Sequence, residues 1–218
     1  VIYSDHRFAY EDVQEILEKK EGIYEPELTA INNIAKTLRK DRLKSGSIAF
    51  EKTEVKFKLS DDKKPVDVFF KIQKDAHKLI EEFMLLANKA VALKVGKKEK
   101  TSDHAKTFVY RIHDMPDPTK LKDFADFIKR FGYRVDLNTP QNIATSINEL
   151  LVKIKGKPEQ NIIEMLAIRS MAKAEYSTNN IGHFGLAFPF YSHFTSPIRR
   201  YPDMMAHRML FSYLKIKN

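Results

Sequence analysis

The spacing of apolar residues predicts helices near the start of the chain. An opening strand at 1–4 is followed by a helix over 11–22, on which three apolar side chains share one face: Val13, Ile16 and Leu17. A second helix opens at Pro26 and runs to about Lys44. Its far end is rich in lysine and arginine, which favours either a solvent-exposed terminus stabilised by the helix dipole or a patch that contacts phosphate.

The period changes to two between residues 48 and 72. Apolar and polar residues alternate on both sides of a polar connection at 60–65, which predicts a β-hairpin with Asp61 and Asp62 in its turn. The helix predicted next, over 74–93, has broad apolar coverage and is expected to be mostly buried. Three of its residues fall on a narrow strip that is interpreted as a polar face: His77, Glu81 and Asn88.

Helices dominate the second half of the predicted fold. After a loop at 94–106 and a strand at 107–112, a rigid connection at 113–118 leads into a helix that ends at Gly132. The inward face of that helix carries Leu121, Phe124, Ala125 and Ile128. A short strand at 133–137 and helices from Pro140 to Ile154 and from Pro158 to about Ala174 complete the prediction. No repeat or domain linker is found, so the expected fold class is α+β, a mixed sheet with packed helices in one unit.

Composition narrows the class of protein. The 218 residues are 43% hydrophobic and 11% aromatic, as expected for a globular chain. The absence of cysteine excludes disulfides and cysteine-ligated metals, and it favours a reducing compartment, by default the cytoplasm. No apolar run is long enough to span a membrane. The formal net charge of +9 favours an anionic partner.

Several common enzyme motifs are missing. The sequence has no P-loop, no glycine-rich dinucleotide fingerprint and no serine-hydrolase elbow, so we expect no dinucleotide cofactor. Its seven histidines form no zinc-binding pair, and no dense aspartate cluster is suited to hold magnesium ions. We therefore predict no metal site within this chain.

The segments 182–187 and 191–203 follow neither period and combine aromatic, small, hydroxyl and arginine residues. Thr195, Ser196 and Pro197 can turn into a helix whose N-terminal N–H groups, together with Arg199 and Arg200, form a site for a phosphate or a carboxylate. Pro202 would start that helix slightly later and still leave the arginines near its positive end. The alternative is that both arginines are surface ion-pair partners.

This segment, with His207-Arg208 downstream, resembles the signature of the RNB family of exoribonucleases, and more closely its ribonuclease R branch. The blocks at 7–13, 75–88 and 110–114 are similar to family blocks in the same order. The resemblance implies a processive 3′ to 5′ hydrolytic exoribonuclease that degrades single-stranded RNA to nucleoside 5′-monophosphates. It also implies an RNB-type catalytic fold.

Site residues follow from the resemblance. Arg199 matches the catalytic arginine, whose guanidinium contacts the scissile phosphate. Tyr10 and Phe50 match aromatic residues that hold the 3′-terminal nucleotides, and Glu81, or its neighbour Glu82, matches a carboxylate near the ribose. Each of the three also has a structural interpretation, as core aromatics and a helix-face carboxylate.

Residues around Arg199 complete the predicted site. Thr195, Ser196 and Arg200 are further candidate RNA contacts. A scaffold role is favoured for Arg200, as it is for three residues downstream: Asp203, His207 and Arg208. Asp203 and His207 are four residues apart and are expected to pair along the helix.

The family's metal-holding aspartates belong to a block that precedes everything in this chain. We therefore interpret residues 1–218, which begin without methionine, as the middle and C-terminal part of one RNB domain. The metal-binding block, the cold-shock domains and the S1 domain are not among them. Mg²⁺ is expected in the intact enzyme, which is expected to be monomeric, and this piece alone is expected to be inactive. The alternatives are a catalytically dead homologue that binds RNA and, more remotely, a basic scaffold domain.

Overall fold

The computed structural model describes residues 3–50, 54–71, 73–97 and 106–214. The chain divides into two compact units, one made of Val1–Lys40 and Phe50–Phe83 and the other of Asp41–Ala49 and Met84–Asn218. Both boundaries near residues 40 and 83 fall inside helices, so no Pro- or Gly-rich linker marks them in the sequence. No helix in the described ranges is both long and apolar enough to cross a membrane.

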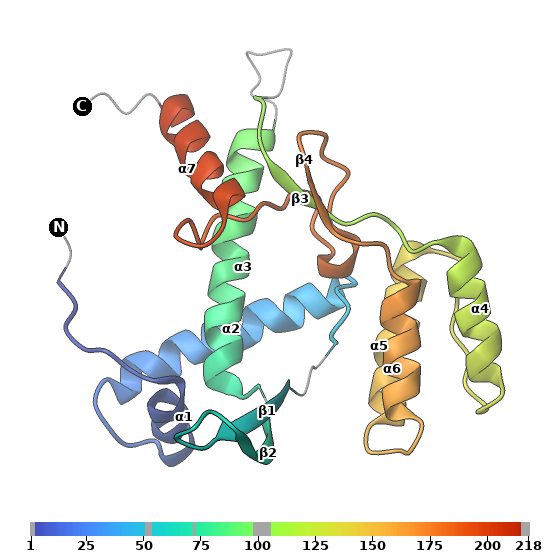
Figure 1. The fold of residues 1–218 in the computed structure, drawn as a ribbon. Helices are drawn as coiled ribbons and strands as arrows, with labels where there is room; N and C mark the ends of the chain where they lie inside the picture. The colour runs from blue at the N-terminus through green and yellow to red at the C-terminus, as the bar shows by residue number, and fades with distance from the viewer. Residues whose placement is uncertain (1–2, 51–53, 72, 98–105, 215–218) are drawn as a thin grey trace. The chain divides into compact units, whose positions relative to one another are not determined.

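The first unit holds one whole helix, most of a second, the start of a third and a hairpin. Helix α1 spans Tyr10–Lys19 and α2 spans Glu25–Lys44, while β1 (Glu54–Leu59) pairs antiparallel with β2 (Pro65–Lys71) (Figure 1). The predicted helices and hairpin are thus confirmed, with Asp61 and Asp62 in the turn. Its small core contains Leu28, Ala35, Ala76 and Leu79.

The opening strand predicted at 1–4 is wrong for the described residues of that segment. Residues 3–9 are irregular, and residues 1–2 lie outside the described range. The rings of His6 and Phe8 lie 4.3 Å apart, and Phe8 also meets Tyr24 edge-on at 6.3 Å. Ring contacts therefore hold this segment without a neighbouring strand.

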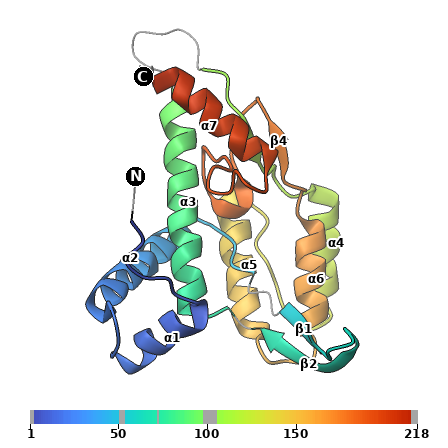
Figure 2. The same cartoon turned by 60° about the vertical axis from the view of Figure 1, so that its left-hand side comes forward.

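The second unit contains a small sheet and two packed helices. Strand β3 (Tyr110–Ile112) pairs antiparallel with β4 (Glu175–Ser177). The C-terminal half of α3 (Asp75–Gly96) and helix α7 (Tyr201–Leu214) lie side by side in Figures 1 and 2. Their shared core consists of Ala92, Val95, Phe108, Tyr110, Ile112 and Ala206. A Cβ on Gly96 would lie 2.5 Å from the Tyr110 hydroxyl, so the close approach requires glycine there.

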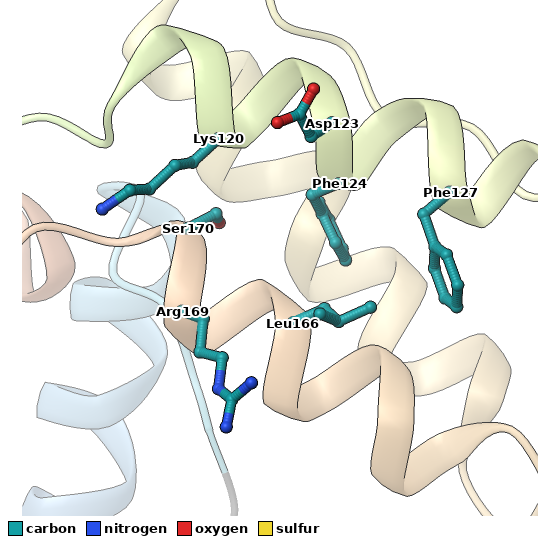
Figure 3. A pocket seen from close by; sticks show the side chains of 7 residues that line it. All are labelled: Lys120, Asp123, Phe124, Phe127, Leu166, Arg169 and Ser170. Carbon is teal, nitrogen blue, oxygen red and sulfur yellow. The ribbon is translucent and has the colours of Figure 1, made fainter.

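Three further helices form the rest of the second unit: α4 (Pro118–Lys129), α5 (Pro140–Ile154) and α6 (Gln160–Ser170). Two of these helices begin at a side-chain N-cap: Asp117 accepts from Thr119 and Lys120 N–H, and Thr139 accepts from Asn142 N–H. The inward face predicted for α4 is buried as expected. Lys120 and Arg169 flank a groove of about 490 Å³ between α4 and α6, with Phe124, Phe127 and Leu166 in its apolar lining (Figure 3).

Two predictions in this region differ from the structure. Residues 133–137 are irregular: no strand in the described ranges pairs with them, and the Asp136 N–H is satisfied by Ser146 Oγ at 3.1 Å. Helix α6 is shorter than the helix predicted from Pro158 to about Ala174, since it begins at Gln160 and ends at Ser170. Met171 and the residues up to β4 adopt extended or irregular backbone.

Candidate functional site

A turn at residues 196–200 leads directly into α7. The Ser196 carbonyl accepts hydrogen bonds from the N–H groups of Arg199 at 3.3 Å and Arg200 at 3.1 Å. Helix α7 begins at Tyr201, so the arginines precede the positive end of a helix dipole, as the sequence predicted for the later start. The Arg199 side chain is exposed. This placement leaves its guanidinium available to an anionic ligand.

Asp203 anchors this turn from inside α7. Its side chain is fully buried, and Oδ2 accepts from the Ser196 N–H at 2.8 Å and from Arg200 Nη2 at 2.9 Å. Arg200 is therefore an ion-pair partner, as the alternative interpretation expected, and its pair with Asp203 is partly buried. For Arg199 no ion pair is found within the part of the chain that the structure describes.

The predicted pairing of Asp203 with His207 is wrong. His207 Nε2 instead donates to the Phe194 carbonyl at 2.8 Å, and its ring stacks on that of Phe194 with centroids 3.9 Å apart. The spacing rule considers partners on the same helix, whereas both side chains here bind the segment that precedes the helix. The scaffold role expected for Asp203 agrees with its contacts.

Three buried polar atoms at this turn lack a hydrogen-bond partner among the described residues: Thr195 Oγ1, Arg200 Nε and Asp203 Oδ1. Buried polar atoms are nearly always paired in folded proteins, and exceptions gather where water, an ion or a ligand completes the bonding. The cluster therefore marks the turn as a candidate binding place.

Asn88 is the residue of this site that the sequence did not predict. Its side chain is only 3% exposed, so the interpretation of its strip of α3 as a solvated polar face is wrong at this position. Oδ1 accepts from the N–H groups of Phe194 at 2.9 Å and Thr195 at 3.2 Å, and Nδ2 donates to the Tyr191 hydroxyl at 3.2 Å. No local signal could have found it, because all three partners lie more than 100 residues away.

Three histidines gather next to this segment in the second unit. His113 Nδ1 accepts from the Gly185 N–H at 3.0 Å, its Nε2 donates to the Ala172 carbonyl, and its ring lies 4.9 Å from that of His183. Burial, and then the neighbouring His113, lowers the pKa of His183 to about 3. Burial, and then the Arg200 charge, lowers the pKa of His193 to about 4. Both rings are therefore neutral near pH 7.

Acid should destabilise the second unit because these two histidines are held neutral. Their pKa values lie below the ordinary 6.5, so the stabilisation is fully present above pH 6.5 and is lost as pH falls toward 4 and 3. The slope for His183 is at most about 1.4 kcal/mol per pH unit. Urea unfolding followed between pH 7 and 4 measures it. His183→Gln should flatten this dependence and the exposed His6→Gln should keep it; equal slopes in all three proteins would contradict the assignment.

Two of the predicted RNA contacts in the first unit, Tyr10 and Glu81, lie on α1 and α3. Tyr10 begins α1, is 42% exposed, and its ring stacks in parallel on that of His77 with centroids 4.4 Å apart. Glu81 follows His77 by one helical turn and is half-buried, whereas Glu82 is buried and pairs with Arg39 at 3.6 Å. An ion-paired, buried Glu82 is less able to meet a ribose than Glu81.

Phe50 and the basic end of α2 are placed less distinctively. Phe50 is partly buried in an irregular segment. On α2, Lys36 pairs with Asp75 at 2.8 Å, and Arg42 is buried and donates to Ser47 Oγ at 2.7 Å. Neither a purely solvated terminus nor a phosphate patch accounts for a buried arginine, so this end of the helix is in part structural.

The residues present do not fit a metal site. Across the described ranges, no group of three or more histidine, aspartate or glutamate side chains is arranged to hold a metal ion. The Oδ2 atom of Asp203 already accepts from Ser196 and Arg200.

Nearly all of the chain matches the model of one protein family. The model of the RNB domain matches residues 1–216, and the chain belongs to this family. Among curated relatives, it is 41% identical to ribonuclease R of Thermotoga maritima over 99% of this chain and 30% of the relative. It is 36% identical to ribonuclease R of Escherichia coli over 100% of this chain and 26% of that protein. The resemblance inferred from the motifs is thus confirmed.

Solved structures agree on the fold. Ribonuclease R of Mycoplasma genitalium, in complex with ribose-methylated single-stranded RNA, is 28% identical with a TM-score of 0.82, covering 95% of this chain and 32% of that one. A yeast pseudonuclease, Ssd1, is 25% identical with a TM-score of 0.67, covering 97% and 26%. The α+β, RNB-type fold is therefore confirmed, and the chain spans about 30% of the length of the first curated relative.

Proposed function

We propose that the protein carrying this chain is a processive 3′ to 5′ hydrolytic exoribonuclease of the ribonuclease R type. It acts on single-stranded RNA and releases nucleoside 5′-monophosphates. The observation that carries the proposal is the exposed Arg199 on a turn anchored by buried side chains, in a chain whose relatives are ribonuclease R. The net charge of +9 suits a polyanionic substrate. Incubating the full-length protein with 3′-labelled RNA and identifying the released nucleotide tests it.

Arg199 acts on the phosphate in this proposal. Negative charge gathers on the phosphoryl oxygens in the transition state, and the planar guanidinium offers two parallel N–H donors to them. The turn places the arginine ahead of the α7 N-terminus, whose dipole favours the same charge. RNB nucleases generally depend on a divalent metal, for which we propose Mg²⁺ in the intact enzyme, with ligands outside this chain. The expectation that these 218 residues alone are inactive stays a prediction.

Tyr10 and Phe50 should set the length of the final product. We propose that their rings stack on bases near the 3′ end, where each stacked base contributes about 1–3 kcal/mol. Tyr10→Ala or Phe50→Ala in the full-length protein should therefore release longer end products, because the enzyme lets go of short RNA earlier. Sequencing gels of exhaustive digests measure this length. Tyr133→Ala, at a tyrosine of the α4–α5 connection, is the control, and unchanged products in both test variants would refute the stacking roles.

A second candidate is a catalytically dead RNB homologue that binds RNA. The likeness to a yeast pseudonuclease favours it, because an RNB fold can persist without nuclease activity. The two candidates differ in one measurement: with Mg²⁺ present, the exoribonuclease shortens bound RNA, whereas the homologue retains it intact. Reading the upstream part of the gene for the aspartate block distinguishes them as well.

A further inference from the structure

The segment that carries Arg199 is held at two points by buried side chains. Residues 192–196 belong to no helix or strand, so the backbone offers their N–H groups no regular partners. Asn88 accepts from the N–H groups of Phe194 and Thr195, and Asp203 accepts from that of Ser196. The three consecutive backbone N–H groups of residues 194–196 therefore donate to two side-chain oxygens.

Both side chains come from rigid elements. Asn88 lies in the part of α3 that belongs to the second unit, and Asp203 lies in the first turn of α7. Their side chains are 3% and 0% exposed, so water does not compete for these bonds. The Asn88 carboxamide is itself oriented, because Nδ2 donates to the hydroxyl of Tyr191, which is also buried.

We propose that Asn88 and Asp203 are positioning residues that fix the main chain on which Arg199 stands. The inference rests on the proposed role of Arg199 at the scissile phosphate. Neither side chain donates to a substrate; each acts through the backbone of 194–196. An exposed arginine has many rotamers, so the accuracy of its approach depends on where its Cα is held.

The physical effect expected is a loss of turnover more than of affinity. A displacement of about 1 Å can cost about 100-fold in rate, because the transition state demands tighter geometry than ground-state binding does. RNA affinity is spread over many phosphate and base contacts and should change little. A side chain that served only to stabilise the fold would not separate the two quantities.

The test is a double-mutant cycle in the full-length protein, with kcat, KM and melting temperature measured for each variant. Asn88→Leu removes the acceptor and should lower kcat about 10- to 100-fold with KM changed less than about threefold. Arg199→Lys keeps the charge without the planar fork and retains slow, measurable turnover. In the Arg199→Lys background, Asn88→Leu should cost less than about threefold, because the residue through which it acts is already impaired.

Two further variants keep the test decisive. Asn88→Asp keeps an oxygen for the two N–H groups and lets the Tyr191 hydroxyl donate instead, so it should recover most of kcat. Ile128→Val, in the core of α4, controls for a general loss of stability and should leave kcat unchanged. If Asn88→Leu does not fold, Asn88→Ala, which also removes the acceptor of the Phe194 and Thr195 N–H groups, takes its place in the cycle with the same expected results.

The outcomes separate this inference from the proposed function. Wild-type kcat in Asn88→Leu, or equal losses in both arginine backgrounds, would overturn the positioning role while leaving Arg199 as the catalytic residue. If Arg199→Ala itself keeps its turnover, the proposed function fails first. A kcat loss that occurs with Arg199 present and not with Lys at that position, with KM retained, supports the positioning role.

Discussion

Replacing Arg199 with alanine in the full-length protein should abolish RNA cleavage and leave most of the RNA affinity. The guanidinium is exposed ahead of α7, and in the proposed reaction its hydrogen bonds to the phosphoryl oxygens strengthen as charge develops. Losing such a group costs typically about 100- to 1,000-fold in kcat. Single-turnover cleavage with excess enzyme, alongside RNA binding by filter retention, measures both quantities.

Arg208→Ala is the matched control for this experiment. Arg208 is also an exposed arginine, within α7 and beyond the turn, so its loss removes the same charge without touching the turn. We expect its turnover to stay near that of the wild type. An Arg199→Ala protein that keeps most of its turnover, or that loses affinity and rate in parallel, would contradict the assignment of Arg199 to the transition state.

Asp203→Ala should cause the largest loss of stability among the residues of the turn, about 3 kcal/mol in the free energy of unfolding. Its side chain is fully buried and holds the Ser196 N–H and the Arg200 guanidinium. Removing it leaves a positive charge and an N–H group without their acceptor in a site that is largely closed to water. Urea unfolding of the 218-residue chain, followed by circular dichroism, measures the change.

An exposed aspartate provides the comparison for Asp203. Asp126 forms an ion pair with Lys129 on α4 at 2.6 Å, at the same i, i+3 spacing as Arg200 and Asp203 but in full contact with solvent. Asp126→Ala should hardly change the urea midpoint, because solvent screens such pairs. Equal midpoints for the two variants would show that burial adds nothing to the Asp203 contacts.

Helices with local start signals could be predicted from the sequence. Asp117 and Thr139 each satisfy the N–H groups of the helix that follows them, and that information lies within four residues. The strand predicted at 133–137 failed because alternation describes a pleated surface but does not reveal whether a second strand lies beside it. The hairpin succeeded because both of its strands are adjacent in sequence.

The candidate site likewise contains residues that local sequence signals could predict and residues that they could not. Arg199 could be found because its motif is contiguous, and its place before a helix follows from the nearby prolines. Asn88 could not, because a buried asparagine and a solvated one look alike in a helical pattern, and its partners lie in another segment. The pairing of Asp203 with His207 was predicted wrongly because helical spacing identifies only neighbours on the same helix, and both side chains bind residues outside it.

The hydrogen bond between Asn88 and Phe194 also limits how early the site can form while the chain is being synthesised. The two residues are 106 positions apart, and a ribosome adding about 5–20 residues per second needs on the order of 5–20 seconds to cover that interval. During that interval α3 can form, but the N–H groups that donate to the Asn88 carboxamide have not yet been synthesised. The arginine turn is thus assembled only after most of this chain has been made, so much of the positively charged polypeptide exists before the backbone that carries Arg199 is fixed.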